Sequence, residues 1–328
     1  MKLCNKEEAV RYMNRLGLSG RPFIFVVDYK QEQVWIGEPD SIDPEELLYN
    51  LNGFTNDIPE TVALPDKRVV WHTDPVSYEA YSRSFRIVSD HIHAGNSYLV
   101  NLTCATPVQT NLTLKEVFAC SHAPYKLWAK DRFVVFSPEI FVRIEDGFIY
   151  SYPMKGTIDA SLPDARERIL ADGKEEAEHA TIVDLIRNDL SQVASEVTVT
   201  RYRYIDELLT NRGRLLQVSS EIRGRLDGSW QASLGEILFS LLPAGSITGA
   251  PKKKTMEIIA EAETYERGFY TGVTGYFDGR KLDSAVMIRF LEEQDGRLVF
   301  KSGGGITSRS DLQSEYNEMK QKVYVPIY

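Results

Sequence analysis

Cysteine is scarce in this sequence. The 328 residues include three cysteines, Cys4, Cys104 and Cys120, at irregular spacing and without a CxxC pair. Such a set predicts neither a disulfide framework nor a zinc ribbon, and it fits the reducing cytoplasm. None of the three stands in the GxCxG setting typical of a glutaminase nucleophile. We therefore expect that the chain does not release ammonia from glutamine by itself.

Long apolar runs and an excess of positive charge are also missing. No hydrophobic stretch approaches the roughly 18 residues that a membrane-spanning helix requires, and the opening segment MKLCNKEEAVRYMNRLG is charged with helical periodicity. The formal net charge of −9 argues against nucleic-acid binding, which depends on clustered Lys and Arg. We expect a cytoplasmic protein with a small-molecule substrate and neither a membrane nor a nucleic-acid partner. If the substrate is an anion, its site must supply positive charge locally.

Several common catalytic motifs are absent as well. Among the five histidines, His91 and His93 are two residues apart, which is not a helical ligand pair, and no HExxH occurs. The glycine run in KSGGGITSRSD lacks the GxxxxGK[ST] spacing of a nucleotide-binding P-loop. The sequence therefore gives no support to zinc, Ser/His/Asp or nucleotide chemistry.

What the chain does have is the composition of a globular protein, with 43% hydrophobic and 26% charged residues. No repeat or Pro/Gly/Ser-rich linker divides it, so we expect one domain over residues 1–328. Three Asp-Gly pairs join candidate strands and favour tight hairpins, which predicts mainly antiparallel sheets. The β-branched and aromatic runs that predict strands are Phe23–Tyr29, Arg132–Phe136, Ile140–Ile144, Phe148–Tyr152, Val273–Phe277, Ala285–Leu291 and Leu298–Lys301.

Helical periodicity is confined to separate blocks of the chain. Strands and helices do not alternate as they do in βαβ units, so the predicted class is α+β. The predicted helices are Pro75–Ala94, Ala165–Asp189, Pro251–Glu263 and Asp311–Val323.

Two of the predicted helices carry acidic faces. In EEAEHATIVDLIRNDL, helical spacing places Glu178 on the apolar side of the helix with Glu175 beside it. In DLQSEYNEMKQKV, Glu315, Glu318 and Lys322 share a face. Two acidic faces suit magnesium, which takes a few carboxylates together with water and substrate oxygens. The alternative interpretation is a solvated face with salt bridges, such as Glu318 with Lys322.

Positive charge and glycine are concentrated at two further motifs. In SITGAPKKKTMEII, Lys252 stands at a predicted helix N-terminus, where the helix dipole is already positive, so it is either solvated or faces an anion. In KSGGGIT, Gly304 and Gly305 let the backbone approach a ligand and offer N–H groups to an anion, although a simple turn is the alternative.

One lysine and one glutamate stand in apolar surroundings. Lys155 lies in SYPMKGTI, where desolvation would lower its pKa and make it a nucleophile, unless it is an exposed strand end. Glu139 lies in FSPEIFV, where burial would raise its pKa and make it a general acid, unless it is an ordinary carboxylate at a strand entry.

Taken in order, these segments resemble the chorismate-utilising enzymes: anthranilate, aminodeoxychorismate, isochorismate and salicylate synthases. The resemblance rests on GNSYLVNLT, FSPEIF, PMKGTI, EHATIVDLIRNDL, PAGSITGAPKKKTMEII, YTGVTGYF, AVMIRF, SGGGIT and SEYNEMKQK, from about residue 80 to residue 328. It implies a two-lobed sandwich of mainly antiparallel sheets with helices outside. Residues 1–79 would be a shortened N-terminal part of the same fold, without the tryptophan-inhibitor segment of anthranilate synthases.

The resemblance also implies a set of site residues. Mg²⁺ would be bound by Glu178 and Glu318, with Glu175 and Glu315 as direct or water-mediated ligands, and would hold the ring carboxylate of chorismate. The residues implied for the other carboxylate and the rest of the pocket are Thr157, Lys252, Tyr270, Arg289, Gly304, Gly305 and Lys322.

The subtype depends on two residues. By the resemblance, Glu139 protonates the departing hydroxyl at ring carbon four, and Lys155 attacks ring carbon two, where anthranilate and isochorismate synthases usually carry a small residue. This favours the large, aminating component of aminodeoxychorismate synthase, with ammonia from a separate glutamine amidotransferase subunit and a downstream aminodeoxychorismate lyase. The alternatives are a sibling synthase and a non-catalytic chorismate-binding subunit. One departure from the family is Leu216 in RLLQVSSEI, where a His is common.

Overall fold

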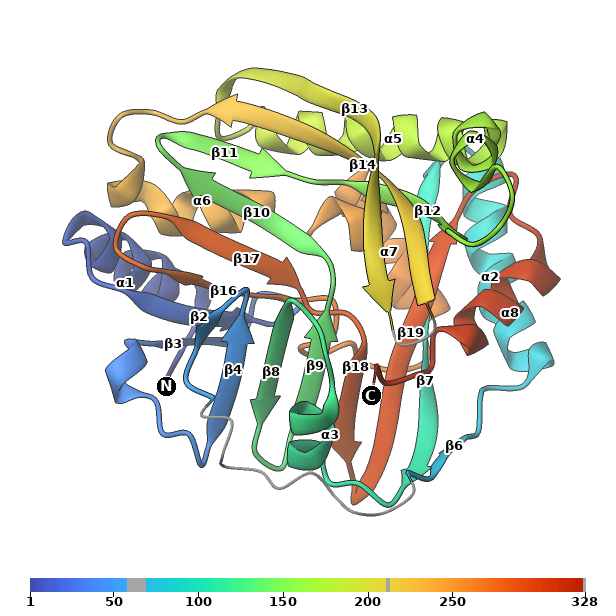
Figure 1. Ribbon diagram of the computed structural model, residues 1–328, viewed down its shortest axis with the longest axis horizontal. Coiled ribbons are helices and arrows are strands. Elements are labelled where there is room, and N and C mark those ends of the chain that lie inside the picture. The colour runs from blue at the N-terminus through green and yellow to red at the C-terminus, as the bar shows by residue number, and fades with distance from the viewer. Residues whose placement is uncertain (58–68, 211–212, 327–328) are drawn as a thin grey trace.

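Two antiparallel β-sheets form the centre of the molecule, with helices on their outer faces (Figure 1). The computed structural model describes residues 1–57, 69–210 and 213–326. All strand pairs in this part of the chain are antiparallel, which confirms the predicted α+β class and the sandwich architecture. No helix among these residues combines the length and the apolar composition needed to cross a membrane.

The first sheet has ten strands in the described structure, and β13 lies outside the main path because it pairs with β14. In spatial order the strands are β1 (Lys2–Cys4), β3 (Val34–Gly37), β2 (Phe23–Val27), β16 (Val273–Phe277), β17 (Leu282–Val286), β10 (Ile140–Glu145), β11 (Phe148–Ser151), β14 (Gly213–Arg225) and β12 (Met154–Asp159), with β13 (Ser195–Thr210) beside β14.

The second sheet has nine strands in the described structure. In spatial order they are β15 (Gly249–Ala250), β7 (Leu99–Thr110), β19 (Arg297–Ile306), β18 (Phe290–Gln294), β9 (Phe133–Ser137), β8 (Tyr125–Ala129), β4 (Leu47–Leu51) and β5 (Phe54–Thr55), with β6 (Trp71–Thr73) beside β7.

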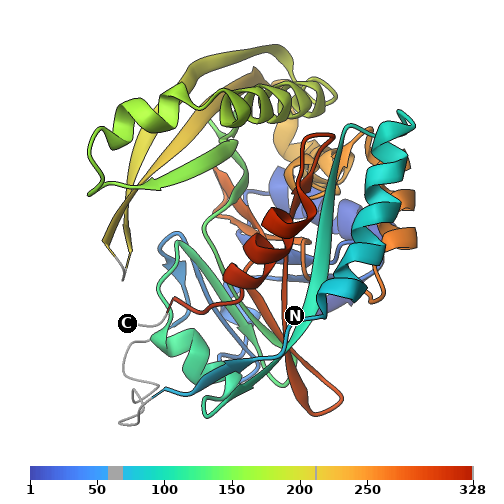
Figure 2. The same cartoon turned by 90° about the vertical axis from the view of Figure 1, so that its right-hand side faces the viewer.

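Helices cover the outer faces of both sheets (Figures 1 and 2). The apolar faces of α1 (Lys6–Leu18), α5 (Gly173–Leu190) and α6 (Leu234–Leu241) pack on the first sheet. Those of α2 (Tyr78–His93), α7 (Lys252–Ala262) and α8 (Leu312–Gln321) form a cluster with β7 of the second sheet. The remaining helical segments are α3 (Leu114–Cys120), α4 (Ala165–Ala171), η1 (Pro39–Ser41), η2 (Trp230–Ser233) and η3 (Gly245–Ile247).

The sequence of strand β2 is an unbroken apolar run because its two faces pack against different clusters. Phe23 and Phe25 point toward α1 and α6, whereas Ile24 and Val26 join the cluster between the two sheets. Because both faces are buried, the strand shows no alternation of polar and apolar residues.

The three predicted Asp-Gly hairpins are all present. Asp146-Gly147 joins β10 to β11, and Asp295-Gly296 joins β18 to β19; both residues of each pair have positive φ, from 50° to 76°. Two successive positive φ angles are what a two-residue hairpin turn of type I′ requires. Asp278-Gly279 joins β16 to β17 with positive φ at the glycine.

Two of the predicted elements are wrong, because each is divided into two in the structure. The single strand Ala285–Leu291 is two strands, because the chain leaves the first sheet after Val286 and enters the second at Phe290, with Arg289 at φ 54° between them. The single helix Ala165–Asp189 is also two, because Asp172 is extended, and its carboxylate accepts a hydrogen bond from the Glu175 N–H (3.0 Å) at the start of α5.

Strand β13 is the longest strand and lies at an edge of the first sheet. Among the described strands it pairs with β14 alone. Its register shifts at three places between Ser195 and Tyr204, and Glu196 and Arg203 have positive φ. The strand is therefore irregular over most of its first half.

A buried ion pair ties three elements together beneath the cavity described below. The side chains of Glu263 and Arg267 are 3% and 2% exposed, and their closest atoms are 2.6 Å apart. Arg267 also donates to the carbonyls of Ile247 (3.0 Å) in η3 and Asn101 (2.7 Å) in β7. The arginine thus satisfies carbonyl groups that would otherwise be buried without a donor.

We predict that Arg267→Met lowers the free energy of unfolding by about 3–5 kcal/mol, because it leaves the Glu263 carboxylate buried without its cation. Urea denaturation followed by tryptophan fluorescence measures the change. The matched control is Arg83→Met, which breaks an exposed pair with Glu79 and is expected to cost roughly 0–1 kcal/mol. Equal losses in the two variants would contradict the structural role of Arg267.

Candidate active site

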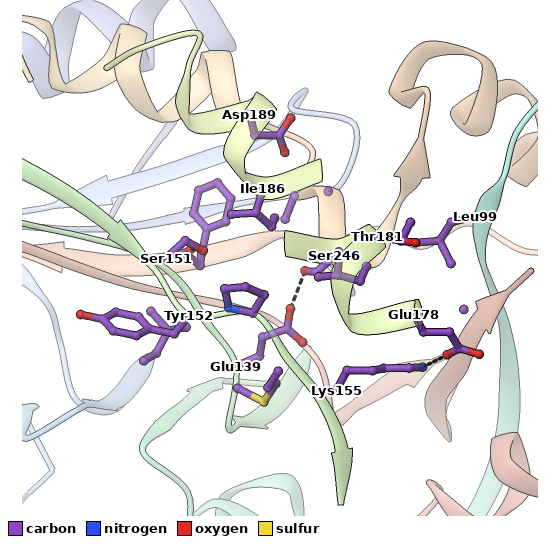
Figure 3. Close-up of a pocket in the computed structure, with 18 of the residues that line it drawn as sticks. Leu99, Glu139, Ser151, Tyr152, Lys155, Glu178, Thr181, Ile186, Asp189 and Ser246 are labelled. Carbon is purple, nitrogen blue, oxygen red and sulfur yellow. Dashed lines mark hydrogen bonds and ion pairs between the residues drawn. The ribbon is translucent and has the colours of Figure 1, made fainter. Parts of the chain in front are cut away.

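A cavity of about 360 Å³ lies between the first sheet, α5 and the end of β19. This is within the range of about 300–1,000 Å³ that small-molecule sites occupy. Four of the predicted site residues line it: Glu139, Lys155, Glu178 and Gly305. Figure 3 shows Glu139 and Lys155 on one wall of the cavity, with Ser246 and Glu178 reaching toward them from neighbouring segments.

Glu139 is held in place just before β10. Its carbonyl accepts a hydrogen bond from the Val286 N–H (3.0 Å), and its carboxylate Oε1 accepts one from the Ser246 hydroxyl. Burial raises the pKa of Glu139, although the Ser246 hydrogen bond and the charges of Arg289 and Lys322 oppose the rise. A carboxyl with a raised pKa stays protonated to higher pH and is able to donate a proton.

Lys155 extends from β12 to the carboxylate of Glu178 on α5. Its Nζ lies 2.8 Å from Glu178 Oε2, and the two side chains are 31% and 15% exposed. Burial by itself lowers the pKa of Lys155, but Glu178, Glu175 and Glu318 outweigh it, so the pKa is raised. The expectation of a lowered pKa is therefore wrong for this state of the site, because the lysine is surrounded by carboxylates.

Gly156 permits this crowding of acids next to Lys155. Its φ is 83°, and a Cβ atom there would lie 3.2 Å from Glu175 Oε2. A larger residue would therefore meet both backbone strain and the Glu175 carboxylate. The neighbouring Thr157 is exposed and pairs with Gln217 of β14.

A second acidic group is formed by α8 against β19. Lys322 Nζ lies 2.6 Å from Glu318 Oε1 and donates to the Gly303 carbonyl (2.8 Å). The Glu315 carboxylate accepts a hydrogen bond from the Ser310 hydroxyl (2.7 Å).

Gly304 is the point of β19 that these α8 side chains approach. A Cβ atom at Gly304 would lie 3.4 to 3.6 Å from Glu318 Oε1, Glu315 Oε2 and Lys322 Nζ. This residue is thus a close neighbour of the cluster, while the next one, Gly305, lines the cavity itself. The ion pair between Glu318 and Lys322, which the alternative interpretation of this helix predicted, is also present.

The donor chemistry of these carboxylates fits a hard divalent cation. Within the part of the chain that the structure describes, no group of three or more His, Cys, Asp or Glu side chains is arranged to hold a metal. Magnesium does not require such a group, because it is often bound by one or two carboxylates with water and substrate oxygens. Glu178 of α5 and Glu318 of α8 both act on the charge of Lys155, and two such carboxylates are the donors that magnesium prefers.

Lys252 lies behind the cavity wall. Its Nζ is 2.8 Å from Asp189 Oδ2 and donates to the Leu241 carbonyl (2.8 Å). Asp189 lines the cavity, and its carboxylate would lie 2.7 Å from a Cβ atom at Gly245. A lysine at this helix N-terminus is therefore stabilised by an acid from α5, and it fixes the wall of the cavity from outside.

Tyr270 and Arg289 also lie outside the cavity-lining set. Tyr270 is buried, with its ring 6.0 Å from that of Phe290. The Arg289 guanidinium lies 5.3 Å from the Tyr324 ring centroid, and its charge reaches Glu139. Leu216 is buried opposite Ile158 of β12 and does not line the cavity either.

Several cavity residues were not predicted from the sequence. Ser246 and Asp189 stand inside motifs that were recognised, but nothing in the sequence showed that Ser246 would meet Glu139, 107 residues away. Tyr98, Thr307 and Arg309 also line the cavity. Thr307 and Arg309 could have been predicted as site residues because they closely follow the glycine run in the sequence.

Known proteins are similar to this chain over most of its length. It is 51% identical over 318 residues to an uncharacterized PabA-like protein of Pasteurella multocida (strain Pm70), covering 97% of this chain and 98% of the relative. It is 32% identical over 314 residues to aminodeoxychorismate synthase component 1 of Klebsiella aerogenes, covering 91% of this chain and 67% of that protein.

Solved structures show the same fold. The menaquinone-specific isochorismate synthase of Escherichia coli matches with a TM-score of 0.76 at 16% identity, over 98% of this chain and 82% of that one. Anthranilate synthase component I of Streptococcus pneumoniae matches with a TM-score of 0.65 at 26% identity, over 80% of this chain and 60% of that one. The family model described as chorismate binding enzyme matches residues 15–327, and the chain therefore belongs to this family.

Proposed function

We propose that the protein replaces the hydroxyl at ring carbon four of chorismate with an amino group, giving 4-amino-4-deoxychorismate without loss of pyruvate. The observation that carries this proposal is that Lys155 and Glu139 face one cavity, the first as an amine and the second as a carboxyl with a raised pKa. The similarity to the Klebsiella aerogenes aminodeoxychorismate synthase component supports it.

The roles of the two residues follow from their chemistry. Because the pKa of Lys155 is raised beside Glu178, the lysine must first lose a proton. Its amine then attacks ring carbon two while the double bond shifts, and Glu139 protonates the hydroxyl that leaves carbon four as water. Loss of hydroxide without a proton donor would be slow. Ammonia then attacks carbon four, the double bond shifts back, and the Lys155 amine is expelled. Ser246 holds the Glu139 carboxyl toward the cavity.

The acidic residues of α5 and α8 would hold Mg²⁺ in this proposal. Glu178 and Glu318 are the proposed ligands, with Glu175 and Glu315 as direct or water-mediated ones. The ion, when bound, supplies the positive charge that holds the ring carboxylate of the substrate. The Lys155 amine then reacts from the same end of the cavity, since its Nζ already lies at Glu178.

The other carboxylate of the substrate needs cations from the protein. We propose that Lys322 and the backbone at Gly304 and Gly305 bind it, with Arg289 adding its charge nearby. Lys252 and Tyr270 act through the residues they contact, because neither lines the cavity. Thr157 is proposed to contact the substrate at the edge of the site, from its exposed position on β12.

Ammonia is proposed to come from a separate glutamine amidotransferase subunit. All three cysteines are buried, and burial raises the pKa of Cys104 to about 12. A thiol in such a setting is a poor nucleophile. Reduced thiols also fit the proposed cytoplasmic location, where a downstream aminodeoxychorismate lyase would form p-aminobenzoate.

The first prediction concerns the product. Purified protein incubated with chorismate, Mg²⁺ and excess ammonium is expected to form aminodeoxychorismate, identified by chromatography and mass spectrometry, and p-aminobenzoate only after lyase is added. Anthranilate, isochorismate or salicylate as the product would instead assign a sibling reaction. Binding of chorismate without any turnover would support a non-catalytic subunit.

Lys155→Ala is expected to reduce the rate of amination on the order of 10²-fold or more, because it removes the nucleophile. Steady-state kinetics with ammonium measure the loss. The matched control is Lys254→Ala, which removes an exposed lysine paired with Glu257 on α7 and is expected to keep the wild-type rate. Unchanged amination by Lys155→Ala would exclude its nucleophilic role.

The pH dependence of kcat/KM tests the proposed role of Glu139 as the proton donor. Only its protonated form donates, so kcat/KM is expected to fall as pH rises through its raised pKa. Ser246→Ala removes a hydrogen bond that favours the charged carboxylate, so the pKa rises further and the alkaline limb moves to higher pH. Glu139→Gln is expected to lower kcat by about 10²–10⁴-fold and to abolish that limb. An alkaline limb that survives in Glu139→Gln would assign it to another group.

A further inference from the structure

The proposed metal carboxylates are each paired with a lysine. Glu178 on α5 meets Lys155 of β12 at 2.8 Å, and Glu318 on α8 meets Lys322 of the same helix at 2.6 Å. Figure 3 shows the first pair, with Lys155 and Glu178 reaching toward each other across the cavity.

The charges of these pairs match the charge of the proposed ion. Two ammonium groups carry together the same charge as one Mg²⁺, and they face the same carboxylates. A cluster of four acids from two helices would repel itself if it were left without cations. In the metal-free protein, Lys155 and Lys322 therefore neutralise the carboxylates that a divalent cation would neutralise when bound.

The proposed function also uses both lysines toward the substrate, Lys322 as a cation and Lys155 as the nucleophile. Lys155 lines the cavity, and Lys322 lies beside Gly304, one residue from the cavity-lining Gly305. While each ammonium is paired with a glutamate, it is less available to a substrate. An ion that took over the two carboxylates would release both lysines from these pairs.

We propose that Lys155 and Lys322 are internal counter-ions that compete with Mg²⁺ for Glu178 and Glu318, and that metal binding releases them from these carboxylates. This inference rests on the proposed metal site of the proposed function. Mg²⁺ bound alone must displace two ion pairs, so its affinity is weakened. Once displaced, Lys322 pairs with a substrate carboxylate and Lys155 is free to react, so metal and substrate strengthen each other's binding by equal factors.

The test measures Mg²⁺ affinity without turnover. Metal-free protein is titrated with MgCl₂ alone by isothermal calorimetry, for the wild type, Lys155→Gln, Lys322→Gln and the double variant. Each single variant is expected to bind Mg²⁺ about tenfold more tightly than the wild type, and the double variant more tightly still, in the range of 5- to 150-fold typical of coupled sites.

Two controls separate competition from other effects. Lys254→Gln removes the same charge from an exposed pair with Glu257 on α7 and is expected to leave Mg²⁺ affinity within about twofold of the wild type. Lys155→Arg keeps the cation at Glu178 and is expected to retain the weak wild-type affinity. Circular dichroism melting verifies that each variant folds, and Lys322→Gln carries the test if Lys155→Gln does not.

The proposal is overturned if Lys155→Gln and Lys322→Gln bind Mg²⁺ no more tightly than Lys254→Gln, or if none of the proteins binds Mg²⁺ at all. The outcome is independent of the reaction chemistry. A protein that forms anthranilate from chorismate would refute the proposed amination and still show tighter Mg²⁺ binding in the glutamine variants.

Discussion

Carboxylates crowd the centre of this molecule, and the fold around them depends on placing a cation beside four of them. A charge removed from water is costly unless it is paired and hydrogen-bonded. Two of the four pairs join different elements, Glu178 of α5 with Lys155 of β12 and Asp189 of α5 with Lys252 of α7, and so fix the relative position of these segments. The pairs are Glu178 with Lys155, Glu318 with Lys322, Asp189 with Lys252 and Glu263 with Arg267.

The two sheets supply the frame in which these pairs meet. Glu139 and Lys155 belong to the first sheet and Gly304 to the second, while α5 and α8 bring acids from either side. Glycine is used where the backbone must come closest to a carboxylate, at Gly156 beside Glu175 and at Gly304 beside Glu318. The site is therefore built from rigid elements, and few of its polar groups depend on long loops.

The sequence predicted the parts of this arrangement that depend on local chemistry. The Asp-Gly hairpins and the acidic faces of two helices followed from turn preference and from helical spacing. The break at Arg289 did not, because AVMIRF is an apolar run on both sides of the point where the chain changes sheets. The Lys252 pairing with Asp189 and the raised pKa of Lys155 were also missed, since each depends on acids from another element. The family resemblance implied a set of site residues, but it did not show which of them line the cavity.

The open edge of strand β13 bears on whether copies of the protein associate through their sheets. Its outer side is a sheet edge, and a long regular edge is a template for adding strands from other molecules. The three register shifts and the left-handed residues Glu196 and Arg203 interrupt the row of hydrogen-bonding groups. Ion pairs to Arg203 and Arg225 add fixed charge along the same ribbon. No further strand of the described chain covers this edge. Its irregular backbone and its charged side chains therefore protect the molecule against edge-to-edge aggregation.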